Sequence, residues 1–246
     1  MSAATPCTEN STSSTSRSPL RTESAHSPAT AGEGHSGAGA FDPRGANLAL
    51  EDGEPQLPAS PPRSRLAWCI TGSGHFLEES LALAARLPSV DLFLSAAAEE
   101  VLPIYKLSIE SLKPRFRVFR DKTASGVPVG MLYDDIYHTV VVAPATSNTV
   151  AKCAFGISDT LPTNMFAQAG KLGIPGIVFA CDTEPVVVTK SPHDWVTLRP
   201  RRIELDNVER LRGIDFCQVV CSPAELETAL DTRLKELSLA WNTSSS

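Results

Sequence analysis

The stretch TVVVA at residues 139–143 decides the fold. Its three consecutive valines leave no polar side, so a strand formed here must be covered on both faces. Strands of that kind occur in parallel sheets that carry helices on both sides, and this one is expected at the centre of its sheet. The segments around it should therefore alternate between short apolar strands and amphipathic helices.

The chain from residue 66 onward follows that alternation. Three further apolar runs predict strands: LAWCIT at residues 66–71, VDLFLS at 90–95 and GIVFA at 176–180. Shorter strands are expected at 116–119 and 216–221, and apolar side chains at helical spacing predict helices at 76–87, 97–107, 148–156, 163–172, 207–212 and 223–237. The predicted fold class is α/β: a doubly wound parallel sheet in a single Rossmann-like domain, with the three layers of a flavodoxin-like fold.

Three segments fall outside this pattern. Most of residues 1–60 are Ser, Thr, Ala, Pro or Gly, and they include no Val or Ile. Such a segment buries too little apolar surface to offset the entropy of ordering it, so we expect a disordered tail at 1–63 and a folded domain at 64–240. Residues 113–134 are interrupted by Pro and Gly and indicate little regular structure, and the polar run TKSPHDWVT at 189–197 suits a flap or a surface loop.

The overall composition excludes several functional classes. The chain has 246 residues with 22 Lys and Arg against 28 Asp and Glu, a formal charge of -6, which argues against a nucleic-acid partner. No apolar run is long enough to cross a membrane, and the start lacks the pattern of a secretory signal. The 6 Cys show no C-x-x-C spacing and the 5 His no ligand spacing, so we expect a cytoplasmic protein without a structural metal.

Ligands of open parallel sheets bind beyond the carboxyl ends of the strands, and two such ends carry small polar residues. Gly72, Ser73 and Gly74 follow the first strand, where glycines let a ligand approach the backbone and free N–H groups suit a phosphate. A plain tight turn explains them equally well, because the third glycine of the dinucleotide motif is replaced by Leu77. Ser95 ends the second strand and would either contact the same phosphate or cap the next helix.

The third unusual strand end follows TVVVA. Pro144, Ala145 and Thr146 are small enough to leave room for a flat ring, and the helix start that follows offers hydroxyl, amide and N–H groups from Ser147, Asn148 and Thr149. A well-capped helix without a ligand is the alternative.

These residues carry a resemblance to a known family. The run APATSNTVAKCAFGISDTLPTNMF at 143–166 resembles the APxSANTxAKxAxGxxDxL segment of the FMN-binding flavoprotein superfamily, which includes homo-oligomeric cysteinyl decarboxylases and flavin prenyltransferases. ITGSGHF at 70–76 and FLSAAAEEV at 93–101 extend the similarity to residues 66–178. The resemblance implies bound FMN and a homo-oligomer built from trimers.

The same resemblance assigns the candidate cofactor residues. It implies phosphate and ribityl contacts from Gly72, Ser73, Gly74 and Ser95. The isoalloxazine ring would lie against Pro144, Ala145, Thr146 and Asn148, with Ser147 and Thr149 completing the loop.

Departures from the family pattern narrow the expected reaction. Decarboxylases carry a His on a helix before the central strand and a later P-x-M-N motif, whereas here His138 abuts the strand and CDTE at 181–184 follows GIVFA. RRIELDNVERLRGI at 201–214 resembles the archaeal-type branch that includes the acceptor-linked dihydromethanopterin reductases. We therefore expect an FMN-dependent reductase that transfers hydride to a pterin-type substrate, with an unidentified electron donor. The alternatives are a flavin electron carrier without its own substrate, and a decarboxylase or prenyltransferase.

Reduction of a pterin also requires a proton, for which Asp182 and His138 are the candidate catalytic residues. Each has a simpler explanation: Asp182 would cap a helix or turn, and His138 would be a hydrogen-bonded histidine at the start of a strand.

Overall fold

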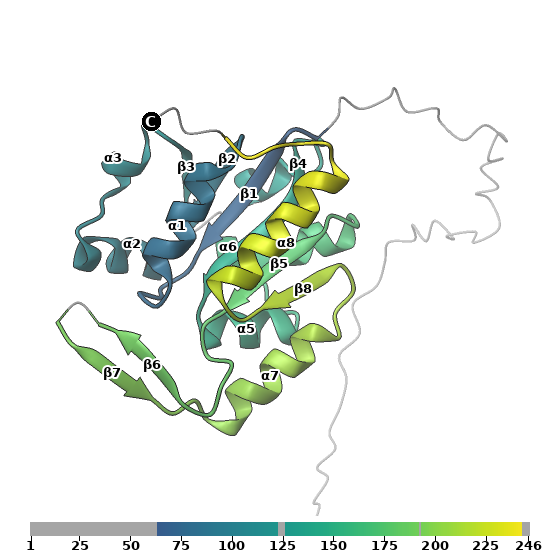
Figure 1. Ribbon diagram of the computed structural model, residues 1–246. Coiled ribbons are helices and arrows are strands. Elements are labelled where there is room, and N and C mark those ends of the chain that lie inside the picture. Colours follow the sequence, from purple (N-terminus) through teal and green to yellow (C-terminus); the bar gives the residue numbers. More distant parts are fainter. Residues whose placement is uncertain (1–62, 123–125, 192, 243–246) are drawn as a thin grey trace, which may run out of the picture. The chain divides into compact units, whose positions relative to one another are not determined.

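The computed structural model describes residues 63–122, 126–191 and 193–242, all of which belong to one compact unit. The predicted disordered tail, residues 1–63, lies outside the described residues except for Arg63. In chain order the elements are β1 (Arg65–Ile70), α1 (Leu77–Arg86), β2 (Val90–Leu94), α2 (Ala96–Val101), the 3-10 helix η1 (Leu102–Tyr105), α3 (Ile109–Leu112), β3 (Arg117–Arg120), α4 (Gly126–Gly130), β4 (Tyr137–Ala145), α5 (Ser147–Ala154), α6 (Leu161–Lys171), β5 (Gly176–Ala180), β6 (Val187–Lys190), β7 (Trp195–Leu198), α7 (Arg202–Arg212), β8 (Cys217–Val220) and α8 (Pro223–Glu236) (Figure 1).

The main sheet has six strands in the order β3-β2-β1-β4-β5-β8, and each neighbouring pair is parallel. The TVVVA run lies inside β4, between β1 and β5, and all nine residues of β4 are buried. The predicted doubly wound α/β fold and the central place of this strand are therefore confirmed.

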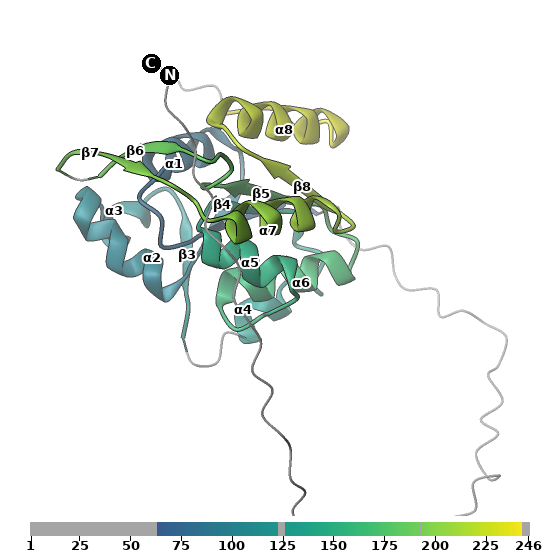
Figure 2. The same ribbon diagram turned by 90° about the horizontal axis from the view of Figure 1, so that it is seen from below.

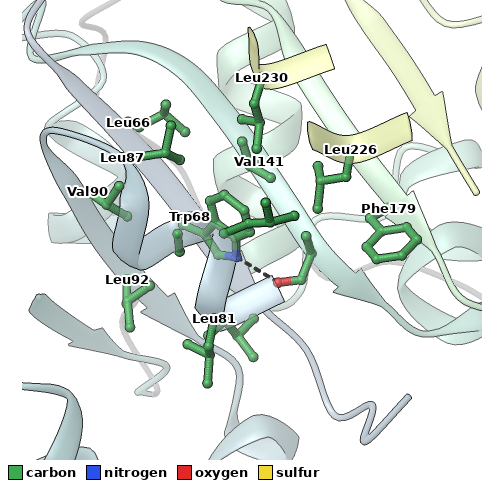
Figure 3. Close-up of a cluster of buried hydrophobic side chains, with 14 of the residues drawn as sticks. Leu66, Trp68, Leu81, Leu87, Val90, Leu92, Val141, Phe179, Leu226 and Leu230 are labelled. Atoms are coloured by element: carbon green, nitrogen blue, oxygen red, sulfur yellow. Dashed lines mark hydrogen bonds between the residues drawn. The ribbon is translucent and has the colours of Figure 1, made fainter. Parts of the chain in front are cut away.

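Helices cover both faces of the sheet because successive side chains of a strand point to opposite sides. On one face Trp68 packs with Leu81 of α1 and Leu230 of α8 (Figure 3). On the other face Cys69 packs in a cluster with residues of α5, α6 and α7, and Figure 2 shows α8 on one side of the sheet and α5 and α6 on the opposite side. The Trp68 indole N–H also donates a 2.8 Å hydrogen bond to the Ala143 carbonyl, which joins β1 to β4 inside the core.

The amino-terminal edge of the sheet is held by a buried carboxylate. Asp91 of β2 is fully buried and accepts hydrogen bonds from Arg65 of β1, Arg117 of β3 and the Tyr137 hydroxyl of β4. Burial alone would raise the pKa of Asp91, but these hydrogen bonds outweigh it and hold the pKa below its ordinary value. One side chain thus links four strands.

Several parts of the chain differ from the sequence prediction: α3 was not expected, α7 begins five residues earlier than expected, and two larger differences follow. The polar run at 189–197 belongs to an antiparallel hairpin, β6 and β7, because Val187 and Val188 extend it and pair with Leu198 and Thr197. The stretch 113–134 contains α4 despite its glycines, since this short helix packs against α6 and tertiary contact overrides its weak helix propensity.

The sheet has a switch point between β1 and β4, where the strand order reverses direction. The loops after β1, β2, β4 and β5 all leave the same edge, because the strands are parallel. No helix in the described part of the chain is long and apolar enough to cross a membrane.

Candidate functional site

A cleft of about 430 Å³ opens at the carboxyl ends of β1, β2 and β4. It brings together five of the residues predicted from sequence, namely Gly72, Ser95, Thr146, Asn148 and Thr149. The cleft lies beside the switch point, where open parallel sheets bind their ligands. Its volume is in the range of small-molecule sites in proteins.

The two glycines after β1 are closely packed. A Cβ atom at Gly72 would lie 2.6 Å from the Cβ of Ala97, and one at Gly74 would lie 1.9 Å from the Tyr105 hydroxyl. The close packing of a tight turn is therefore observed. Gly72 also lines the cleft, so the turn and a ligand contact are compatible at this residue. Ser73 is directed toward the end of β5, where its hydroxyl lies 3.2 Å from the Cys181 sulfur and donates to the His75 carbonyl.

Ser95 acts as the cap that the sequence offered as an alternative. Its Oγ accepts a 3.0 Å hydrogen bond from the Ala98 N–H, and the residue is 7% exposed. The hydroxyl proton is not used in that bond, so Ser95 can still donate to an anion in the cleft that it lines.

The loop from β4 to α5 combines a helix cap with an exposed amide. Thr146 caps α5, because its Oγ1 accepts from the Thr149 N–H at 3.2 Å. Asn148 is exposed in the first turn of this helix and faces the cleft. Pro144 and Ala145 are the last two residues of β4 and are buried, so they form the floor of the loop rather than lining the cleft.

A second cluster lies where β5 ends. The Ser147 hydroxyl donates a short hydrogen bond to Asp182, which is half-buried. Burial raises the pKa of the neighbouring Cys181 to about 12, so this thiol stays protonated at neutral pH. His75, on the turn after β1, has its Nδ1 2.6 Å from the Thr189 hydroxyl of β6, and burial lowers its pKa against the opposing charges of Asp182 and Glu79.

His138 is not at this site, which corrects the expectation that it would supply a proton here. It is the second residue of β4 and lies seven residues before the end of the strand, which at roughly 3.3 Å per residue is about 23 Å away. It is 3% exposed, its Nδ1 contacts the Thr139 hydroxyl, and its carbonyl accepts from Arg233. Burial and the nearby Arg233 lower its pKa to about 4.

Several side chains of the site, Ala96, Ala97 and Thr160 among them, were missed by sequence reasoning. Lys152 and Asp121 line the cleft, and Thr71 joins two of its loops from beneath. Lys152 could have been found, because it follows Asn148 by four residues and so shares its helix face. Asp121 directly follows β3, the shortest of the expected strands, and Thr71 is the last residue of the strand expected at 66–71.

Two further cavities lie outside this cleft, one near it and one toward the opposite edge of the sheet. One of about 290 Å³ separates the start of α1 from the hairpin and is lined by His75, Glu78, Tyr105 and Trp195 among others. Another, of about 370 Å³ and mostly apolar, includes Gly176 at the start of β5 and therefore lies toward the amino-terminal edge.

Comparison with known proteins agrees with the resemblance. A family model described as Flavoprotein matches residues 56–238. The crystal structure of DmrB from Burkholderia xenovorans in complex with FMN, described as a cubic protein cage for redox transfer, is 70% identical with a TM-score of 0.69, covering 72% of this chain and 99% of that one. An uncharacterized protein of Methanocaldococcus jannaschii is 37% identical over 68% of this chain and 94% of its own length.

A relative with a functional name is matched over a shorter stretch. Dihydromethanopterin reductase (acceptor) of Methanosarcina mazei is 38% identical over 143 residues, which are 53% of this chain and 60% of that protein. This chain therefore aligns with less than two thirds of that reductase.

Proposed function

This chain belongs to the flavoprotein family, and from that premise we propose that it is an FMN-dependent reductase acting on a dihydropterin-type acceptor. The observation that carries the proposal is the cleft at the switch point, where Gly72, Ser95, Thr146 and Asn148 meet. The 70% identity to the FMN complex of DmrB supports FMN as the cofactor. The acceptor follows the name of the Methanosarcina mazei relative.

The residues of the cleft fit an FMN molecule in chemical type. Hydroxyl and backbone N–H groups around Gly72 and Ser95 suit the phosphate and ribityl chain, and the Lys152 ammonium, which is ion-paired with Asp159 at 2.8 Å, lies in the same lining. The loop from Pro144 to Thr149, with Asn148 exposed, is proposed to hold the flat ring.

When bound, FMN supplies the hydride chemistry, and the protein contributes binding, orientation and a proton. We propose Asp182 as the group that passes a proton to the acceptor, since it stands at the end of β5 beside Ser147 and is half-buried. His138 has no part in this proposal because it lies at the opposite edge of the sheet.

The competing reactions of the superfamily lack their residues in this chain. After β5 stands Cys181-Asp182-Thr183-Glu184 in place of the P-x-M-N motif of the decarboxylases. A flavin carrier without its own substrate uses the same cleft, and only the response to an acceptor separates it from a reductase.

We further propose that the protein works as a homo-oligomer. The hairpin of β6 and β7 exposes large apolar side chains, with Trp195 72%, Val188 56% and Leu198 40% exposed. Val188 and Trp195 lie on one face of this two-stranded ribbon and Leu198 on the other, and exposed apolar side chains of this kind are typical of protein interfaces. The similarity to a protein described as a cubic cage supports self-association.

The test is spectroscopic. The purified protein is examined for visible flavin absorbance, reduced without oxygen, and then mixed with a dihydropterin. Flavin absorbance that bleaches on reduction and recovers with the dihydropterin would support the reductase. Absorbance that recovers only with electron acceptors that are not pterins would favour the carrier. A protein that neither contains nor takes up FMN would refute the cofactor assignment.

A further inference from the structure

We propose that Thr71 is a positioning residue for FMN: its buried hydroxyl clamps the turn after β1 to the loop after β4 and so sets the spacing of these two segments, which both line the cleft. The inference rests on the proposed function, because it takes FMN as the occupant of the cleft. Thr71 would act through its neighbours, since it does not itself line the cleft.

The Thr71 hydroxyl uses both of its hydrogen-bonding roles on one loop. Its Oγ1 donates to the Pro144 carbonyl at 2.7 Å and accepts from the Thr146 N–H at 3.0 Å. The side chain is buried, with the residue 2% exposed, so water does not compete for these bonds. A hydroxyl in this position therefore fixes two points of the loop at once.

Backbone pairing between β1 and β4 does not by itself hold the loop after β4 in place. The paired residues of β1 and β4 end at Cys69 and Val142, short of the residues that form the cleft. Beyond that pair, the side-chain links between the two segments are the Trp68 indole on the Ala143 carbonyl and the Thr71 hydroxyl. The Trp68 link holds the strand, whereas the Thr71 link holds the loop.

The two segments that Thr71 joins both line the cleft. Gly72, the next residue after Thr71, belongs to the lining, and so does Thr146, whose N–H is bonded to the Thr71 hydroxyl. A shift between them would move the proposed phosphate contacts relative to the proposed ring contacts. A cofactor that must touch both segments binds more weakly when the spacing is no longer preset.

The decisive substitution is Thr71→Val, which keeps the shape of the side chain and removes only the hydroxyl. It leaves the Pro144 carbonyl and the Thr146 N–H without this partner, and we expect the dissociation constant for FMN to rise about tenfold or more. Thr71→Ser restores the hydroxyl and should return the affinity close to the wild-type value. The visible circular dichroism of bound flavin should change in the valine variant and recover in the serine variant.

Thr139→Val is the matched control. Thr139 is also a fully buried threonine in this sheet, and its hydroxyl is bonded to Arg233 at 3.0 Å and to the His138 ring at 2.8 Å. It lies near the amino-terminal end of β4, away from the cleft. Its loss should lower the melting temperature as Thr71→Val does, without changing FMN affinity or the flavin spectrum.

Wild-type affinity in Thr71→Val would overturn the inference, as would an equal loss of affinity in Thr139→Val, because the effect would then be one of general stability. If Thr71→Val yields no folded protein, Thr71→Cys replaces it, since a thiol is a weaker hydrogen-bonding group of similar size. Wild-type affinity in Thr71→Cys would then count against the clamp, and an intermediate loss would support it. Absence of FMN binding in the wild-type protein would refute the proposed function itself, which distinguishes the two failures.

Discussion

Replacing Asp91 with asparagine is expected to destabilise the sheet strongly while leaving the cofactor cleft intact. The carboxylate is fully buried and accepts from Arg65 at 3.0 Å, from the Tyr137 hydroxyl at 2.7 Å and from Arg117 at 2.5 Å. Asparagine keeps the shape but removes the charge and turns an NH₂ group toward donors. These contacts lie at the amino-terminal edge, so FMN affinity should be unchanged.

The expected magnitude follows from how exposed the partners are. Removing one partner of a buried ion pair costs about 3–5 kcal/mol, because the other charge is left uncompensated. Here the Arg65 and Arg117 side chains are 32% and 50% exposed, so water can solvate both guanidinium groups after the change. Water cannot solvate the buried Tyr137 hydroxyl in the same way, so the free energy of unfolding should fall by about 2–4 kcal/mol.

Thermal unfolding measures this loss. For a domain of this size the expected fall in melting temperature is about 5–12 °C. Asp134→Asn, which changes an exposed carboxylate, is the matched control and should be nearly silent. A fall in Asp91→Asn no larger than in that control would refute the argument that this carboxylate holds the four strands together.

The pH dependence gives the same prediction a second readout. The folded pKa of Asp91 is lowered, so its contribution to stability is present above the ordinary aspartate pKa and is lost as pH falls through the folded value. The wild-type protein should therefore lose stability below about pH 4, and the asparagine variant should show a smaller drop over that range.

Three further outcomes are expected. Lys152→Met should weaken the binding of FMN more than that of riboflavin, because only FMN carries the phosphate. Lys171→Met, which changes an exposed lysine on α6, is the control and should affect the binding of neither flavin. Equal losses of affinity for both flavins in Lys152→Met would contradict a phosphate contact. Gly74→Ala should cost about 1–3 kcal/mol of stability, measured by denaturant unfolding, because the new Cβ overlaps the Tyr105 ring. In the double variant, Tyr105→Ala should recover part of that loss. Losses that simply add in the double variant would show that the Tyr105 ring is not the cause. Trp195→Ser should shift the protein toward smaller assemblies in light scattering if the hairpin is an interface, and an unchanged mass would exclude this side chain from the contact.

The order of strands was predictable because burial leaves a strong mark on composition. TVVVA, LAWCI and GIVFA have no polar side, and each lies in a strand with covered faces. The hairpin of β6 and β7 was not predictable to the same degree, since it is a two-stranded ribbon outside the main sheet and its Thr, Lys and Ser residues carry no burial signal. The short helix α4 depends on contact with α6, which a local pattern does not contain.

Some residues of the candidate site could likewise be predicted from the sequence, and others could not. Residues that line the cleft, such as Gly72, Ser95 and Asn148, follow strand ends and could be chosen from their position in the chain. The residues that hold the loops could not, because Thr71 bonds to Pro144 and Thr146 from 73 and 75 positions away. Sequence position predicts which edge a residue reaches, whereas the partner of a buried hydroxyl is decided by how the strands pair.

Strand direction also explains why His138 was the weaker choice of histidine. It precedes the valines of β4, and in a parallel sheet a residue at the start of a strand lies at the edge opposite the ligand. His75 follows β1 and so lies at the carboxyl edge, where its ring contacts Thr189 and experiences the charge of Asp182. The direction of the chain, taken together with the parallel pairing that TVVVA implies, therefore places His75, and not His138, at the carboxyl edge of the sheet.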